Sequence, residues 1–309
     1  MIQRSAYDII RSYMPPLLRS AMGNVEPAVQ KRVNEVRLRV NRPLSFIFSE
    51  GAMFMRSDGS LSASPAVSNP VMITSEDVEN VLRGVSRYSL HSCSKELAQG
   101  YFTIEKGIRV GIAGTMSGAN EPVLKYISSL NFRVSRQVIG CGEQVCSQIF
   151  SSSSKSVVIC GGVNTGKTTL LRDMCRICGD RFKVALIDER SEIAASVGGV
   201  PTNRIGAQTD VLDGYSRSAG VISSIRSLSP DMIFCDEIST EEDAEALLMG
   251  TGCGVKFVAS VHAGSYNELL RRQVMKPLLN AGVFDYALIM EGKSFPGRVK
   301  EIRRLKGNG

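Results

Sequence analysis

The segment GGVNTGKTTLLRD at residues 161–173 places glycines, a lysine and threonines directly before an apolar run. It fits the pattern G-x-x-x-x-G-K-[ST], with Gly161, Gly166, Lys167 and Thr168 in register. Glycines in such a loop allow backbone angles that side chains forbid, so successive N–H groups can converge on phosphate oxygens. A helix that follows the loop directs its positive amino end at the same anion. The pattern predicts that the lysine reaches the β- and γ-phosphates and that the threonine hydroxyl holds Mg²⁺.

The expected ligand is ATP with Mg²⁺, and nine consecutive residues are expected to surround its phosphates. They are Gly161, Gly162, Val163, Asn164, Thr165, Gly166, Lys167, Thr168 and Thr169. The residues on either side support this reading, because a phosphate loop needs a strand before it and a helix after it. SVVIC at 156–160 is a short apolar, β-branched run, and TTLLRDMCRIC at 168–178 has apolar residues at helical spacing. The alternative is an ordinary glycine-rich turn between a strand and a helix.

The run IFCDE at 233–237 adds two acids at the end of an apolar segment. Asp236 is expected to hold Mg²⁺, directly or through water. Glu237 would then lie beside the γ-phosphate, where a carboxylate can orient and deprotonate an attacking water. The alternative is that these acids only cap the next helix.

Other polar residues near presumed strand ends are further candidates for catalysis. Glu189 and Arg190 in LIDER (186–190) could position water, contact the metal or contact a neighbouring subunit, or they could form a cap and a surface ion pair. His262 in ASVHAGS could sense the γ-phosphate or be a hydrogen-bonded core histidine. Arg226 in IRSLSPD could contact phosphate or an adjacent subunit, or form a structural ion pair.

The elements that must position these residues alternate between strand and helix along the second part of the chain. This alternation predicts a mainly parallel sheet with its chemistry at the carboxyl ends of the strands. The expected further strands are 182–189, 230–237, 255–262 and 286–292, and the expected further helices are 216–228 and 239–252.

The first part of the chain has a different pattern, typical of an α+β domain with a largely antiparallel sheet. Its expected strands are 35–49 (one or two), a hairpin at 101–115 that turns near Gly107, and 126–136; its expected helices are 74–86 and a second one ending at Gly100. The polar run SQIFSSSSKS at 147–156 marks the change in composition. The expected domains are 1–140 and 141–309.

The composition is that of an ordinary soluble protein, with 309 residues, 43% hydrophobic and 22% charged. No apolar run approaches the roughly 18 residues needed to cross a bilayer, and the first twenty residues lack the features of a signal peptide. The expected location is therefore the cytoplasm. The net charge of +7 is uneven, with +6 in residues 1–140 and +1 in 141–309. A basic first domain could meet nucleic acid, an acidic partner or a membrane surface, or could simply be solvated.

The eight cysteines lie mostly in apolar segments and are expected to be buried hydrophobes. CRIC at 175–178 has the spacing of a metal or redox motif. It lies, however, within the predicted helix after the phosphate loop, with no second pair at zinc spacing. We therefore expect it to be a buried helix face, and we expect the same of CGEQVC at 141–146.

The motifs of the second domain, in this order and spacing, resemble the secretion-ATPase branch of the RecA-like NTPases. GGVNTGKT resembles the Walker A box, LIDER the Asp box, MIFCDE the Walker B box and ASVHAGS the His box. GKTTLLRD, DERSEIA and IRSLSPD, with EVRLRV, RYSLHS, GIRVGIAG and SSLNFRV in the first domain, are similar to the stage III sporulation protein AA family. The resemblance covers nearly the whole chain. Two departures are Ile108 where a histidine is expected and the lack of a proline after Gly161; the first loosens any role for Arg109.

This resemblance implies a cytoplasmic hexameric ATPase motor on the mother-cell side of the engulfed forespore, acting with a membrane-embedded, secretion-like channel. It also implies that an arginine of the first domain, Arg109 or Arg133, acts on the nucleotide of the next subunit. Two other readings stay open. One is a nucleic-acid-associated ATPase that grips DNA or RNA with its basic first domain, and the other is a structural ring that binds ATP and barely hydrolyses it.

Overall fold

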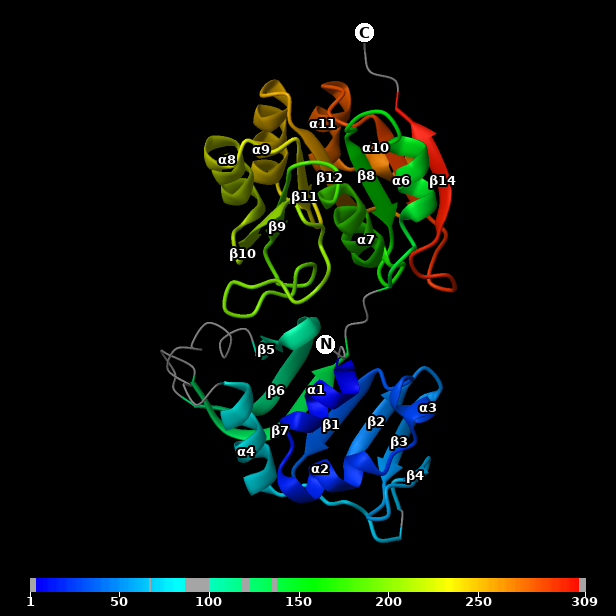
Figure 1. The fold of residues 1–309 in the computed structure, drawn as a ribbon, viewed down its shortest axis with the longest axis vertical. Helices are drawn as coiled ribbons and strands as arrows, with labels where there is room; N and C mark the ends of the chain where they lie inside the picture. The colour runs from blue at the N-terminus through cyan, green and yellow to red at the C-terminus, as the bar shows by residue number, and fades with distance from the viewer. Residues whose placement is uncertain (1–3, 67, 87–99, 118–122, 135–137, 306–309) are drawn as a thin grey trace. The chain divides into compact units, whose positions relative to one another are not determined.

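The computed structural model describes residues 4–66, 68–86, 100–117, 123–134 and 138–305. The chain forms two compact units, Met1–Arg136 and Gln137–Gly309 (Figure 1). The expected helix that ends at Gly100 falls on residues 87–99, outside the described residues.

The first unit is built on a seven-stranded antiparallel sheet with the order β4-β3-β2-β1-β7-β6-β5. Its strands are β1 (Glu35–Arg39), β2 (Ser45–Phe48), β3 (Gly51–Met55), β4 (Leu61–Ser62), β5 (Tyr101–Ile104), β6 (Ile108–Ser117) and β7 (Val123–Arg133). A short 3₁₀ turn, Glu105–Gly107, joins β5 to β6 and forms the hairpin that the sequence predicts. The α+β, antiparallel character of this domain is thus confirmed.

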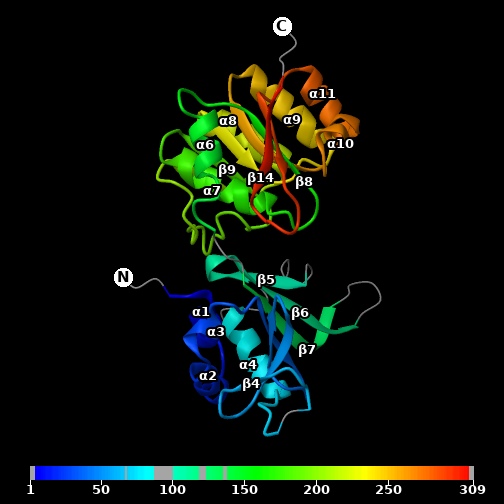
Figure 2. The ribbon, with the colours of Figure 1, turned by 90° about the vertical axis from the view of Figure 1, so that its right-hand side faces the viewer.

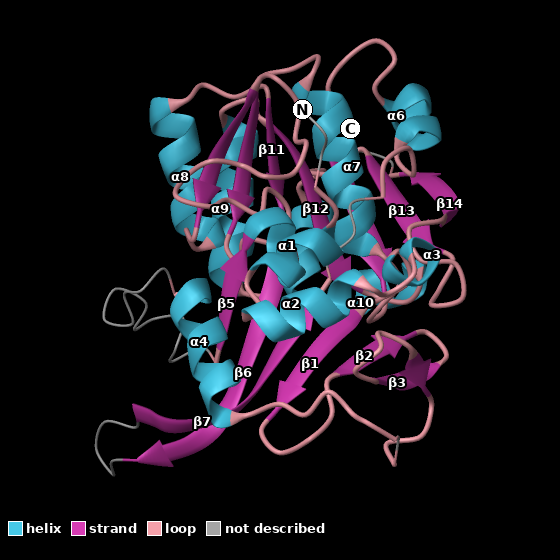
Figure 3. Ribbon diagram, turned by 60° about the horizontal axis from the view of Figure 1, so that its bottom comes forward, coloured by secondary structure: helices cyan, strands magenta, loops and turns pink. Residues whose placement is uncertain are grey.

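The described residues of the first unit also form four helices: α1 (Ala6–Ser12), α2 (Pro16–Gly23), α3 (Pro27–Gln30) and α4 (Ser75–Val85). The first three were not predicted. Thr74 caps α4 through a reciprocal pair of hydrogen bonds with Asp77, as its sequence pattern suggests. Helices α1, α2 and α4 lie over one face of the sheet (Figure 3). Alternate strand residues such as Val36, Phe46 and Phe132 point into this core.

The second unit is built on a seven-stranded sheet with the order β10-β9-β11-β12-β8-β13-β14. The strands β8 to β13 pair in parallel, and β14 pairs antiparallel with β13 at one edge. The bounds are β8 (Val157–Gly161), β9 (Val184–Asp188), β10 (Thr209–Asp213), β11 (Met232–Cys235), β12 (Lys256–His262), β13 (Tyr286–Met290) and β14 (Val299–Arg304). The mainly parallel sheet is confirmed, whereas the two edge strands β10 and β14 were not predicted.

Helices cover both faces of this sheet (Figure 2). One face packs against α6 (Glu143–Ile149) and α7 (Lys167–Gly179). The other packs against α8 (Arg217–Ser227), α9 (Glu241–Gly252), α10 (Tyr266–Arg271) and α11 (Lys276–Asn280), the last two joined by a 3₁₀ turn at Gln273–Met275. Because both faces are covered, the four strands β8, β9, β11 and β13 are apolar almost throughout.

The cysteines of CRIC lie on the buried face of α7, as expected: Cys175 and Cys178 are both inside the core, and Cys146 of α6 is buried in the same cluster. Burial raises the pKa of the Cys235 thiol to about 12. Cys253 differs from the general expectation, because it follows α9 and is exposed. Among the described residues, no helix is long and apolar enough to cross a membrane.

Candidate nucleotide-binding site

The loop between β8 and α7 has the backbone conformation that its glycines and asparagine permit. Asn164 and Gly166 have φ angles of 62° and 86°, in the left-handed region that glycine and asparagine adopt most readily. A Cβ atom on Gly166 would lie 2.2 Å from the backbone nitrogen of Gly297, and one on Gly161 would lie 2.4 Å from Thr165 Oγ1. Both glycines are therefore required for close packing.

Lys167 is the first residue of α7, at the amino end of a 13-residue helix. Its Nζ donates a hydrogen bond of 3.0 Å to the carbonyl oxygen of Gly162. The amine thus lies across the mouth of the loop, where the N–H groups of the first helical turn are also directed. This arrangement suits an anion with several oxygens.

Asp236 directly follows β11, and its carboxylate contacts the start of α7, next to the phosphate loop. Thr168 Oγ1 donates to Asp236 Oδ2 at 3.2 Å, and Ser260 Oγ donates to Asp236 Oδ1 at 2.8 Å. Ser260 comes from β12, which lies between β11 and β8 in the sheet, so the three side chains join the end of β11, the strand β12 and the helix that follows β8. The sequence analysis gave Ser260 no role, although it lies in ASVHAGS, because its carboxylate partner is 24 residues away along the chain.

These donors fit a magnesium ion. A threonine hydroxyl and a carboxylate are hard oxygen ligands, and Mg²⁺ prefers such ligands while keeping several waters and phosphate oxygens. Thr168 and Asp236 would hold the ion, and Ser260 would orient the carboxylate.

A cavity of about 180 Å³ lies between the carboxyl ends of β9 and β11. The candidate residues Glu189, Arg190, Asp236 and Glu237 all line it. The structure therefore brings together the acids and the arginine that the sequence placed at two separate strand ends. A space of this size holds a few water molecules.

Arg217, which the sequence analysis missed, also lines this cavity and is largely buried. Its guanidinium donates to Glu189 Oε2 at 2.5 Å, to Asp243 Oδ2 at 3.0 Å and to Ser239 Oγ at 3.0 Å. The charge of Glu189 is thus compensated within the site by an ion pair, which fixes the position of its carboxylate. No sequence motif predicts this role of Arg217, because its partners are 22 to 28 residues away along the chain.

Asp188, the last residue of β9, is buried and accepts three backbone N–H groups. The donors are Glu192, Ile193 and Ala194, at 2.8 to 2.9 Å. Burial raises the pKa of the Asp188 carboxyl to about 6, although the three hydrogen bonds act in the opposite direction. These hydrogen bonds stabilise the turn that follows β9.

The remaining candidates occupy different places. His262 ends β12 in register with Gly161, so it lies beside the start of the phosphate loop. Arg226 does not join the site within this unit. It is exposed in the last turn of α8, beside the amino end of β11, whereas Asp236 follows the carboxyl end of that strand.

The connection between β13 and β14 forms the other wall of the phosphate loop. Gly297 N donates to Thr165 O at 2.9 Å. In this connection Arg298 lies over the ring of Phe295, 5.5 Å from its centroid, and pairs with Glu291 at 2.8 Å. The sequence analysis also missed the hydrogen bond between Gly297 and Thr165, because these two residues are more than 130 positions apart.

Arg109 and Arg133 lie in the first unit, opposite each other on β6 and β7. They point to the face of the sheet that does not carry the core residues. Arg109 lies over the ring of Tyr101 at 4.6 Å, and Arg133, which is mostly exposed, is 3.9 Å from Glu35.

A buried strand, a glycine-rich loop, a helix that starts with lysine and threonine, and acids at neighbouring strand ends define the class. The second unit has the RecA-like P-loop NTPase fold, and the chain adds a smaller N-terminal α+β unit. Residues 6–309 match the family described as sporulation stage III, protein AA. The chain belongs to this family.

Individual relatives support both the fold and the family assignment. The chain is 33% identical over 307 residues to stage III sporulation protein AA of Bacillus subtilis (strain 168), covering 97% of this chain and 95% of the relative. Among solved structures it is similar to the pilus retraction motor PilT with bound ADP, with a TM-score of 0.60 and 12% identity over 93% of this chain and 78% of PilT. It is also similar to the Legionella pneumophila ATPase DotB, with a TM-score of 0.55 and 11% identity over 94% of this chain and 77% of DotB. At these identities the two structures support the fold alone.

Proposed function

We propose that this protein is a Mg²⁺-dependent ATPase that works as a motor for a secretion-like membrane channel during endospore formation. The observation that carries the enzymatic part is the hydrogen-bonded set Thr168–Asp236–Ser260, with Glu237 beside it in a cavity that holds a few water molecules. The biological setting is taken from the family and from the Bacillus subtilis relative, both named for sporulation stage III.

The residues take the following roles in this proposal. The N–H groups of the loop and the Lys167 amine bind the β- and γ-phosphate oxygens. Thr168 and Asp236 hold Mg²⁺, which neutralises phosphate charge when bound. Glu237 accepts the proton of the attacking water, so that hydroxide adds to the γ-phosphorus as the bond to the β-phosphate oxygen breaks.

Neighbouring residues support this chemistry. Arg217 holds the Glu189 carboxylate in place, so Glu189 orients water or its neighbours. Arg190 contributes positive charge to the same cavity. His262 lies beside Gly161, where it would sense whether a γ-phosphate is bound. Arg226 lies in the last turn of α8, away from the cavity, so it would act only on the nucleotide of an adjacent subunit.

The assembly and location follow from the same proposal. The structural neighbours DotB and PilT are an ATPase and a pilus retraction motor, and we infer a homo-oligomeric ring, a hexamer, with domains near 1–140 and 141–309. Its partners would be membrane-embedded sporulation channel proteins, and its place the mother-cell cytoplasm.

The test is Glu237→Gln, which keeps the shape of the side chain and removes the base. Steady-state hydrolysis of ATP should fall by roughly 10²–10⁴-fold while ATP still binds. Glu245→Gln is the matched control, since Glu245 is exposed on α9. Turnover that survives in Glu237→Gln would show that the base is another group.

A second candidate is a nucleic-acid-associated ATPase. The observation that favours it is the outward face of the first sheet, where Arg37, Arg39, Arg109 and Arg133 stand on three neighbouring strands around Glu35. Stimulation of ATP hydrolysis by DNA or RNA that weakens steeply with salt would support this candidate over the channel motor.

A further inference from the structure

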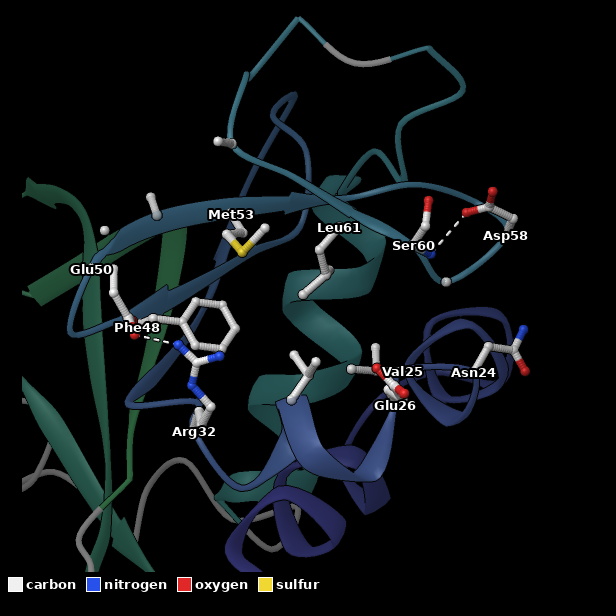
Figure 4. A pocket seen from close by; sticks show the side chains of 15 residues that line it. Asn24, Val25, Glu26, Arg32, Phe48, Glu50, Met53, Asp58, Ser60 and Leu61 are labelled. Atoms are coloured by element: carbon white, nitrogen blue, oxygen red, sulfur yellow. Dashed lines mark hydrogen bonds and ion pairs between the residues drawn. The ribbon is translucent and has the colours of Figure 1, made fainter.

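A hollow of about 740 Å³ lies in the first unit, at the sheet edge where the helices leave the strands uncovered. Its walls are apolar: Val25 and Val29 come from the helical side, and Phe48, Met53 and Leu61 from the strands. Figure 4 shows Phe48, Met53 and Leu61 directed into the space that faces the segment carrying Val25. A volume of this size lies within the range of pockets that bury a ligand.

Both ends of this groove are structurally defined. At one end, Arg32 lies over the Phe48 ring at 6.0 Å and pairs with Glu50. At the other end, the turn before β4 packs so closely on α2 that a Cβ atom on Gly59 would lie 2.4 Å from Asn24 Cβ. The groove therefore runs alongside β3, between two fixed ends.

The rim of the groove is acidic within a basic domain. Glu26, Glu50 and Asp58 line it with one cation, Arg32, which leaves a charge of −2. Residues 1–140 as a whole carry +6. Hydrogen bonds from Ser60 hold the pKa of the Asp58 carboxyl below its usual range, so it is charged at neutral pH. The rim will attract cations and repel phosphates, nucleic acid and anionic lipid.

The strand beside the groove has a partly open edge. In the described part of the chain, β4 pairs only with Phe54 and Met55 of β3. Met55 N donates to Leu44 O, so by antiparallel alternation Met53 and Gly51 also bond towards β2. The N–H and C=O of Ala52 then face away from β2, at a position beyond the end of β4. The residues before and after Ala52, Gly51 and Met53, both line the groove.

We propose that this groove binds an extended segment of another protein, in which lysine or arginine alternates with apolar side chains. The segment adds to the edge of β3 through hydrogen bonds to Ala52, inserts its apolar side chains between Val29 and Met53, and places the cations at its two ends within reach of Glu26 and Asp58 at the rim. Strand addition supplies backbone bonds while the pocket reads alternate side chains. A small apolar ligand would use neither the acidic rim nor the strand edge.

The probe is the fluorescein-labelled peptide KVKLKVK, titrated into the full chain without nucleotide and followed by fluorescence anisotropy. KSKGKSK keeps the charge and removes the apolar side chains, and EVELEVE keeps the apolar side chains and reverses the charge. A third control is KVKLKVK with N-methyl groups on alternate amides, which keeps every side chain and blocks strand pairing. Each control should bind at least about tenfold more weakly than KVKLKVK.

Two protein variants locate the site. Glu26→Lys with Asp58→Lys should weaken KVKLKVK about tenfold or more, whereas the matched pair Glu76→Lys with Glu79→Lys, exposed on α4, should leave binding unchanged. Ala52→Pro removes the outward N–H without touching the bonds to β2, and should weaken binding about two- to tenfold. Hydrogen exchange should slow at the Ala52 amide when KVKLKVK binds.

Three outcomes would overturn the proposal. Equal binding of KVKLKVK and KSKGKSK would show simple charge attraction. Unchanged affinity in the Glu26/Asp58 variant, or unchanged exchange at Ala52, would place the peptide elsewhere. Self-association that is lost in Ala52→Pro, measured by light scattering, would make the groove an interface between copies of this chain.

Discussion

At the scale of single residues, Lys167 is a ligand and not a part of the core. Its amine contacts one carbonyl of its own loop, that of Gly162, and no core side chain depends on it. Lys167→Ala should therefore abolish ATP binding and leave the midpoint of thermal unfolding nearly unchanged. Isothermal titration and circular dichroism measure the two quantities. Lys300→Ala, on the exposed side of β14, is the matched control and should bind ATP normally. Equal affinity in Lys167→Ala and in the unsubstituted protein would contradict the assigned role.

Asp188 gives a pH dependence at the same scale. Its pKa is raised from 3.8 to about 6 by burial, so between those values the folded state binds more protons than the unfolded state. Stability from this group is therefore fully present at low pH and is lost as the pH rises. From about pH 4.5 to about pH 7 the loss should be about 2 kcal/mol.

The measurement is urea unfolding at both pH values, for the unsubstituted protein and for Asp188→Asn. The variant keeps the other titrating groups, so the difference between the two pH slopes isolates this carboxyl. An identical slope in both proteins would mean that the three backbone hydrogen bonds fully offset the cost of burial.

At the scale of elements, Arg217 ties α8 to the end of β9 and to the start of α9. It binds Glu189 and the buried Asp243, whose side chain is 6% exposed. Arg217→Leu should leave Asp243 without a cationic partner, bonded only to the backbone N–H groups of Ser239 and Thr240 and to the Ser239 hydroxyl, and lower the free energy of unfolding by about 2–4 kcal/mol. Urea unfolding measures this loss.

Arg272→Leu provides the comparison for that measurement. Arg272 also pairs with a carboxylate, Glu268, but this pair is half exposed and local to one helix. Its loss should cost less than about 1 kcal/mol. Similar losses in the two variants would mean that the Arg217 bridge is no stronger than a surface pair.

At the scale of the whole molecule, the proposed ring needs a residue that acts across subunits. Hydrolysis leaves charge on the transferred phosphoryl group, and an arginine from a neighbouring subunit commonly stabilises it. Arg109 and Arg133 stand on the outward face of the first sheet, where a neighbouring copy could be reached. If both only served their own sheet, Arg133 would simply neutralise Glu35.

Mixed assemblies separate these roles. Arg133→Ala and Glu237→Gln should each be inactive alone, and their mixture should regain part of the activity, because some interfaces combine an intact arginine with an intact base. The same mixing with Arg109→Ala assigns the role between the two arginines. Arg83→Ala, exposed on α4, should be active without mixing. A mixture that never exceeds the single variants, with a monomeric mass at high ATP by light scattering, would exclude the ring.

Local patterns in the sequence determined most of the second unit. The five inner parallel strands, α7, α8 and α9 each follow from a continuous apolar run or from helical spacing, and the phosphate loop follows from glycines at fixed offsets. Such features depend on neighbours within a few residues, so they can be read along the chain. The strand-end acids were found for the same reason, because each directly follows an apolar strand.

Tertiary structure alone decided which partners these residues meet. Ser260 on Asp236, Arg217 on Glu189 and Gly297 against Thr165 all join residues far apart in sequence. The edge strands β10 and β14 are weakly apolar because each is paired on one side only, so their pattern is lost among loop residues. Likewise, Arg226 looked close to Asp236 along the chain, but the intervening strand β11 carries them to opposite ends of the sheet. Sequence separation says little about distance once a strand crosses the core, and only the fold determines which side chains share a site.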